Sequence, residues 1–181
     1  MYAATIALAD ESAMTQAVIR LRSLGVSRAD LYEVVLQSYL FLGFPRMLIA
    51  AEDLAMVWPQ SERERDYSPV AETDHWRQRG EALYSRVYGA NADRLKERVV
   101  SFAPEIFDWM VVEGYGKVLS RAGLDIVSRE LAIVAFLIVD NRPKQLMSHV
   151  RGAMLVGATA DQLRECACDL ERVAPDGVLA A

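Results

Sequence analysis

The chain has 181 residues, a formal net charge of −5 and 52% hydrophobic residues. This length fits one domain with a sizeable core, and the acidic balance argues against a nucleic-acid partner because it implies no broad basic surface. Acidic substrates remain open, since a local arginine can bind a carboxylate in an acidic protein.

The start of the chain, Met1 to Asp10, lacks the basic n-region of a signal peptide. The longest apolar run, 131–139, has nine residues, far short of the roughly 20 that span a bilayer. We therefore expect a soluble cytoplasmic protein with no membrane partner.

Apolar residues recur at spacings of three and four, and strand-like alternation is absent, so the pattern predicts an all-α fold of about eight helices. Gly25 ends the first helix, the pair Ser27 and Asp30 caps the next, and Gly43 with Pro45 breaks that helix. In chain order the predicted helices cover 11–24, 29–42, 45–56, 75–87, 92–102, 104–115, the stretch after Asp125, 143–156 and 160–173.

Two segments of the chain, one helix and one stretch between helices, have distinctive compositions. The helix 29–42 is apolar on nearly every side, which predicts a central position. Residues 58–74 are rich in proline, serine and charge, which predicts a connector or surface arm. The whole chain, 1–181, is read as a single domain.

A local pattern occurs twice, 132 residues apart. Gly25-Val26-Ser27 is matched by Gly157-Ala158-Thr159, each a glycine stop followed by a hydroxyl cap and a new helix. Two ordinary helix-turn-helix joints and an internal repeat both account for this echo.

Glu130 and His149 are the ionisable side chains of two largely apolar helices. Glu130 has a structural explanation at a helix start, where it complements the dipole or pairs with Arg129 or Arg151, and a lone histidine is usually structural too. The small residues Gly152 and Ala153 follow His149 on its own helix face and leave space beside the imidazole. The alternative is an acid/base pair, or a carboxylate that orients an imidazole.

Gln37 and Arg46 are candidate ligand-binding residues, the amide for a carbonyl oxygen and the guanidinium for a carboxylate. A buried glutamine satisfied by backbone and a solvated arginine are the structural alternatives. With two histidines in the chain, a zinc site is not expected. Cys166 and Cys168 point about 200° apart on a helix, which disfavours a disulfide or a shared metal.

The chain resembles the carboxymuconolactone decarboxylase family, the group that includes the AhpD-like alkylhydroperoxidases. The motifs that carry the resemblance lie in 116–125, Ser128-Arg129-Glu130-Leu131, His149-Val150-Arg151-Gly152-Ala153 and Gly157-Ala158-Thr159, with Arg79-Gly80-Glu81 and Tyr88-Gly89 upstream. Residues 75–173 resemble the family's N-terminal and central part.

The family's closing segment occurs near the N-terminus instead. Residues 15–57 contain its leucine-glutamine pair, at Leu36-Gln37, and its turn, Gly43-Phe44-Pro45-Arg46. The chain therefore resembles a permuted or internally duplicated AhpD-like helical bundle.

The resemblance implies decarboxylation or isomerisation of a small acidic lactone without metal or cofactor. It implies His149 as proton donor, Glu130 as its orienting partner, Arg46 or Arg151 on a carboxylate and Gln37 on a carbonyl oxygen. It also implies a homo-oligomer, a trimer or hexamer.

Two other functions stay open. The peroxidase branch of the family needs a C-x-x-C motif, but Arg142 and Gln145 occupy the expected cysteine positions, which disfavours a thiol peroxidase or disulfide reductase. A non-catalytic oligomeric binding protein with the same fold is the other alternative.

Overall fold

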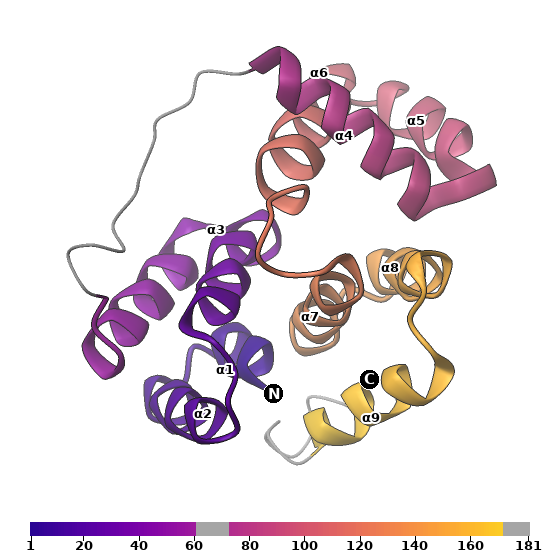
Figure 1. The fold of residues 1–181 in the computed structure, drawn as a ribbon. Helices are drawn as coiled ribbons and strands as arrows, with labels where there is room; N and C mark the ends of the chain where they lie inside the picture. The colour runs from indigo at the N-terminus through magenta and orange to yellow at the C-terminus, as the bar shows by residue number, and fades with distance from the viewer. Residues whose placement is uncertain (61–72, 172–181) are drawn as a thin grey trace.

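A computed structural model describes residues 1–60 and 73–171 of the chain (Figure 1). These residues contain no β-strand, so the prediction of an all-α fold of about eight helices is confirmed. The α-helices are α1 Tyr2–Leu8, α2 Glu11–Ser23, α3 Arg28–Val57, α4 Thr73–Tyr88, α5 Ala92–Val100, α6 Pro104–Trp109, α7 Ile126–Val139, α8 Pro143–Val156 and α9 Ala160–Glu171, with the short 3₁₀ turn η2 Gly89–Asn91 and the π-helix η3 Met110–Leu119.

The helix starts follow the predicted capping chemistry. Ser27 and Asp30 form a complete capping box, and Asp125 accepts a hydrogen bond from the Ser128 amide at 3.0 Å. Both glycines of the repeated pattern adopt left-handed backbone, with φ of 82° at Gly25 and 115° at Gly157. The connector predicted over 58–74 and the helix end predicted at 173 fall largely outside the described residues.

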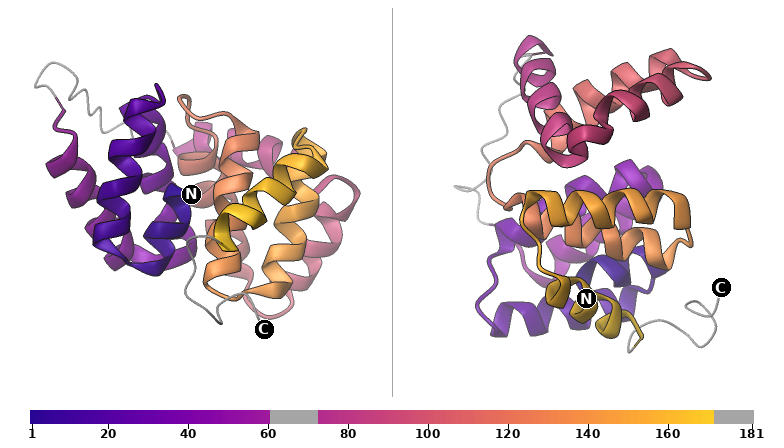
Figure 2. Two further views of the ribbon diagram at one scale, coloured as in Figure 1. Left: turned by 90° about the horizontal axis from the view of Figure 1, so that it is seen from below. Right: turned by 90° about the vertical axis from the view of Figure 1, so that its right-hand side faces the viewer.

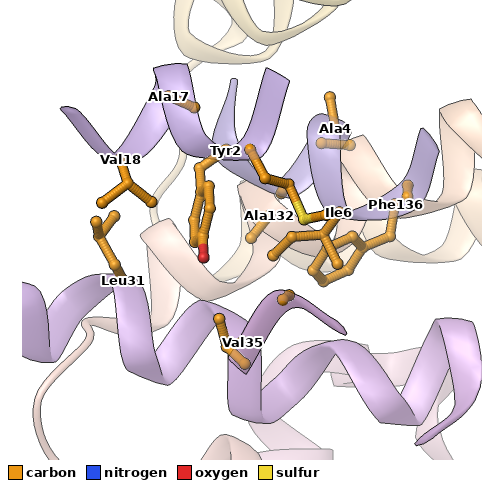
Figure 3. Packing of buried hydrophobic residues seen from close by; sticks show 14 of the residues in the cluster. Tyr2, Ala4, Ile6, Ala17, Val18, Leu31, Val35, Ala132 and Phe136 are labelled. Atoms are coloured by element: carbon orange, nitrogen blue, oxygen red, sulfur yellow. The ribbon is translucent and has the colours of Figure 1, made fainter. Parts of the chain in front are cut away.

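The first helix, α1, was not predicted from the sequence. Its seven residues are apolar except for Thr5, so they show no amphipathic period. Figure 3 shows why they are buried: Tyr2 and Ile6 project into a cluster with Val18 and Leu31 of α2 and α3. A short helix without a polar face is stabilised here by burial on several sides.

The helix α7 is enclosed by two hydrophobic clusters. Ala132 and Phe136 face the cluster of α1, α2 and α3, whereas Ile133 and Leu137 face the cluster of α4, η3 and α8. Figure 2 shows the segment α4 to α6 on one side of α7 and α8, with α1 and α2 on the other. This explains why the run 131–139 is apolar all round.

The helix α3 joins the predicted helices 29–42 and 45–56, and most of its exposed large apolar side chains lie beyond the segment 29–42 that was predicted to be central. It packs on α1, α2 and α7 but leaves Tyr32, Phe44 and Leu48 39%, 58% and 60% exposed. Its backbone breaks at Gly43, where φ is 79° and ψ is 165°, as the sequence predicted. By length and composition α3 is long and apolar enough to cross a membrane, although Glu33, Gln37 and Asp53 are buried along it.

The π-helix η3 packs unusually closely on α4, through one glycine on each helix. A methyl group on Gly116 would overlap the carbonyl oxygen of Trp76, and a methyl group on Gly80 would overlap that of Val111. The predicted helix 104–115 is thus divided into α6 and η3, and the wider π turns carry Gly114 and Tyr115 to the site described below.

We expect Gly116→Ala to destabilise the protein by about 3 kcal/mol or more, because the obstacle is backbone that cannot rotate away. Gly114→Ala on the same π-helix is the matched control, since a methyl group there meets nothing within 4 Å. Urea unfolding of both variants measures the difference. Equal stability of the two variants would contradict this close approach.

Candidate functional site

The site is built around a hydrogen-bonded pair of side chains from α7 and α8. Glu130 lies in the first turns of α7, and His149 lies in the middle of α8. The Glu130 Oε2 to His149 Nδ1 distance is 2.9 Å, and the two side chains are 0% and 8% exposed. The sequence-predicted pair is therefore brought together, with Glu130 fully buried and His149 nearly so.

A carboxylate in this position assigns the two ring nitrogens different roles. Nδ1 donates to Glu130, which fixes the tautomer and the plane of the ring. Nε2 has no hydrogen-bond partner among the residues that the structure describes. The second carboxylate oxygen, Glu130 Oε1, is buried and likewise has no partner there.

The small residues after His149 serve a different purpose from the predicted one. The space beside Gly152 is filled by α4: a methyl group there would lie 2.8 Å from Val87 Cγ1 and 3.4 Å from Glu130 Oε2. Gly152 and the fully buried Ala153 therefore permit close helix packing around the pair. The open space lies on another side of the imidazole.

That open space is a hollow of about 480 Å³ between α3, α5, η3 and α8, with His149 in its wall. Its wall combines apolar and aromatic side chains with a group of polar and charged ones. Apart from His149, the polar and charged lining residues are Tyr88, Arg98, Glu113, Tyr115, Lys144, Gln145 and Ser148. The apolar lining residues are Leu40, Phe41, Leu95, Val99, Phe102, Ile106, Trp109, Met110 and Leu119. An apolar cavity with a few convergent polar groups is the usual form of a small-molecule site.

Two tyrosines of this wall were not predicted as site residues: Tyr88 was noted only in the motif Tyr88-Gly89, and Tyr115 only as the end of a predicted helix. The Tyr115 hydroxyl donates to the Tyr88 hydroxyl at 2.8 Å, so the Tyr88 proton is left for another acceptor. The Tyr88 ring also lies edge-on to His149, with centroids 6.3 Å apart. Tyrosines at positions 88 and 115 carry no sequence signal, because their meeting depends on the packing of α4 against η3.

Burial raises the pKa of Tyr88 to about 12 and that of Tyr115 well above its usual range. Between pH 10 and about 12 the tyrosines of the unfolded chain ionise, whereas the buried ones stay neutral. The free energy of unfolding is therefore constant in this respect below pH 10 and falls as the pH rises toward about 12. We expect Tyr88→Phe to flatten this alkaline loss of stability, measured by guanidinium unfolding at several pH values. An unchanged pH slope would contradict it.

Gln37 and Arg46 lie elsewhere. Gln37 is fully buried, donates to the Arg129 carbonyl at 3.2 Å and accepts from the Arg129 guanidinium at 3.3 Å. Arg46 pairs with Asp140 at 3.1 Å. Neither residue lines the hollow that holds His149. Gln37 thereby links α3 to α7 through a structural contact.

Arg129 is the centre of a buried ionic network behind the site. Its guanidinium contacts Glu33 Oε2 at 2.9 Å and the backbone carbonyls of Arg121 and Leu124. Arg121 pairs with the same Glu33 carboxylate at 3.0 Å but is half exposed. With the bond from Nη1 to Gln37, each of the three guanidinium nitrogens of this buried arginine has a partner, which is the condition for burying a charge.

Arg151 lines a second hollow of about 600 Å³ that adjoins the first one. This second hollow lies between α4, α5 and α8, and it shares Tyr88, Leu95, Arg98, Lys144 and Ser148 with the His149 hollow. Arg151 is thus near the predicted site, in the adjoining space rather than beside His149.

Cys166 and Cys168 are unbridged. Cys166 on α9 is partly buried and its thiol approaches the Leu131 carbonyl at 3.7 Å, while Cys168 is exposed. Burial raises the pKa of the Cys166 thiol, which disfavours the nucleophilic thiolate. Neither cysteine lines the two hollows, and residues 1–60 and 73–171 hold no group of three His, Cys, Asp or Glu that could bind a metal.

Comparisons with known proteins place few limits on this site. No protein-family model matches the chain, and no solved structure matches it. Peroxisomal protein 2 of Schizosaccharomyces pombe (strain 972 / ATCC 24843) is 26% identical over 135 residues, which cover 74% of this chain and 63% of that protein. The chain therefore spans less than two thirds of the length of this relative.

Proposed function

We propose that the chain is a cofactor-free acid/base enzyme of the carboxymuconolactone decarboxylase type. The observation that carries the proposal is the 2.9 Å hydrogen bond between Glu130 and His149 beside an apolar hollow. A buried carboxylate that holds one ring nitrogen leaves the other for a substrate proton, as in general acid/base sites.

The proposed reaction is loss of CO₂ from a small acidic lactone. The bond between the ring carbon and its carboxylate breaks, and the electron pair moves into the conjugated lactone carbonyl to give a dienolate. His149 takes up a proton from solvent at Nε2, becomes an imidazolium paired with Glu130, and gives that proton to carbon, which returns the ring to the Nδ1–H tautomer. One proton is thus consumed for each CO₂ released. The Tyr88 hydroxyl is the group available to donate to the dienolate oxygen, because Tyr115 already donates to Tyr88.

The carboxylate needs a cation in the same space as His149. Arg98 and Lys144 line that hollow, and Arg151 lines the adjoining one. We assign the carboxylate to these residues in place of Arg46, which is paired with Asp140, and we assign Gln37 to the Arg129 network.

The test is turnover of γ-carboxymuconolactone by the wild-type chain and by His149→Ala. We expect the variant to lose about 10²–10⁴-fold in rate, the usual contribution of one general acid or base. Release of CO₂ and the absorbance of the enol-lactone product measure it. Undiminished turnover in a folded His149→Ala protein would remove the role given to this residue.

We further propose a homo-oligomer, a trimer or hexamer, in the cytoplasm and without nucleic acid or membrane as partner. Large apolar side chains stay exposed on α3 and near the His149 hollow, among them Met56, Phe102 and Trp109 at 68%, 69% and 62%. Exposed apolar groups of this size are typical of surfaces that another subunit covers.

The thiol peroxidase or disulfide reductase remains the second candidate in the same family. Arg142 and Gln145 stand where its cysteines would be, and the raised pKa of Cys166 does not suit a nucleophile.

A non-catalytic binding protein would use the same hollow without turnover. Its mark would be ligand binding that is unaffected by His149→Ala, with no product formed.

A further inference from the structure

The second hollow is lined by four cations. Arg94 and Arg98 come from α5, and Lys144 and Arg151 come from α8. The described lining contains no aspartate or glutamate; its other polar groups are Tyr88, Asn91 and Ser148. In a chain with a net charge of −5, this is a local concentration of positive charge.

Helix periodicity separates these cations from the acids of α5. The lining positions 91, 94, 95 and 98 recur at three and four and share one face of the helix. Asp93 and Glu97 fall outside that face and do not line the hollow. On α8 the lining positions 144, 147, 148, 151 and 155 form a matching face.

These four cations have no ion pair or side-chain hydrogen bond within the part of the chain that the structure describes. Elsewhere in that part, Arg46, Arg129 and Arg142 are each paired with a carboxylate. Four like charges around one space repel each other, and a multiply charged anion offsets that repulsion. Arginine forks suit phosphate oxygens in particular.

The cationic hollow shares part of its wall with the His149 hollow. Arg98, Lys144 and Ser148 belong to both walls, and Ser148 directly precedes His149. A ligand of sufficient length would therefore place an apolar group among Phe102, Trp109 and their neighbours and an anionic group among the cations. A small lactone alone would occupy only part of this space.

We propose that this double hollow binds an amphipathic phosphate ester, with its apolar part beside His149 and its phosphate among Arg94, Arg98, Lys144 and Arg151. The proposal rests on the proposed function only in taking His149 as the reacting group. Phosphate fits better than a single carboxylate because its charge of about −1.5 to −2 offsets more of the four positive charges.

The first experiment is calorimetric titration of the full chain with octyl phosphate, 1-octanol and octyltrimethylammonium, which share one alkyl chain and differ in charge. We expect octyl phosphate to bind at least about ten-fold more tightly than the other two, with an affinity that falls as salt is added. Equal affinity for the phosphate and the ammonium compound would overturn the proposal.

The matched variants are Arg94→Gln/Arg98→Gln and the control Arg20→Gln/Lys96→Gln, which removes the same charge outside both hollows. We expect the Arg94→Gln/Arg98→Gln variant to bind octyl phosphate about ten-fold or more weakly than the wild type, and to bind 1-octanol with unchanged affinity. We expect the control to bind both as the wild type does. If the control variant lost the same affinity for octyl phosphate, the loss would come from the change in net charge, and the proposed site would be overturned.

Two further arms separate the alternatives. His149→Ala should retain the octyl phosphate affinity, so loss of turnover and loss of phosphate binding are independent results.

Vesicles of phosphatidic acid and phosphatidylcholine test whether the phosphate belongs to a lipid. Vesicle binding that excess octyl phosphate displaces would support a lipid-derived ligand at the same site. Vesicle binding without any affinity for octyl phosphate would overturn the double hollow.

Discussion

Glu130→Gln is expected to lower turnover by about 100-fold or more while leaving the chain folded. The amide keeps the shape of the carboxylate but removes the charge that holds the proton on His149 Nδ1, and a buried orienting carboxylate usually contributes an effect of this size or larger. The Glu130 Oε2 to His149 Nδ1 distance is 2.9 Å, and the Glu130 side chain is 0% exposed. Water therefore cannot replace the lost carboxylate oxygen. Glu165→Gln, an exposed change on α9, is the control.

A spectroscopic readout makes this prediction independent of the substrate. Nitrogen NMR of the imidazole rings should show a single His149 tautomer with the proton on Nδ1 in the wild type and a mixture in Glu130→Gln. The chain has two histidines, so His75 supplies the reference signal in the same sample. An identical His149 spectrum in both proteins would show that Glu130 does not orient the ring.

Glu33→Gln is expected to destabilise the fold by about 3–5 kcal/mol, because it leaves the charge of Arg129 buried without a counter-charge. Arg129 is 0% exposed and contacts Glu33 at 2.9 Å. Glu52→Gln is the control, since Glu52 is exposed on the same helix α3. Urea unfolding of the three proteins measures the loss.

A comparison of the two arginines sharpens this result. Arg121 binds the same carboxylate but is 46% exposed, so Arg121→Gln should cost no more than about 1 kcal/mol. Similar stability losses for Glu33→Gln and Arg121→Gln would show that the network contributes little through burial.

Much of the fold follows from local sequence. Ser27, Asp125 and Thr159 cap the helices that they were predicted to cap, and Gly25, Gly43 and Gly157 sit where the backbone requires positive φ. These signals act over three or four residues, so the sequence contains them in full. The helix α1 has no such periodic signal, and its formation depends on burial against α3 and α7.

The site was predictable in part. Glu130 and His149 could be found because ionisable side chains are uncommon in apolar helices, and the structure brings them together. The sequence could not decide whether Gln37 binds a ligand or another residue, since the hydrogen-bond partner of a buried polar group depends on the tertiary structure. Its partner is Arg129, 92 residues away.

The sequence by itself determined the helical class, the caps and the two ionisable groups, because helix formation and apolar periodicity are local properties. Only the tertiary structure decided that Tyr88 meets Tyr115, that Arg46 is paired with Asp140, and that Arg94 and Arg151 face one space. Tyr88 meets Tyr115 because η3 approaches α4 closely at Gly80 and Gly116, and α8 lies close to α4 because Gly152 leaves room for Val87. The Arg46 pair depends instead on where the second half of α3 lies relative to the end of α7.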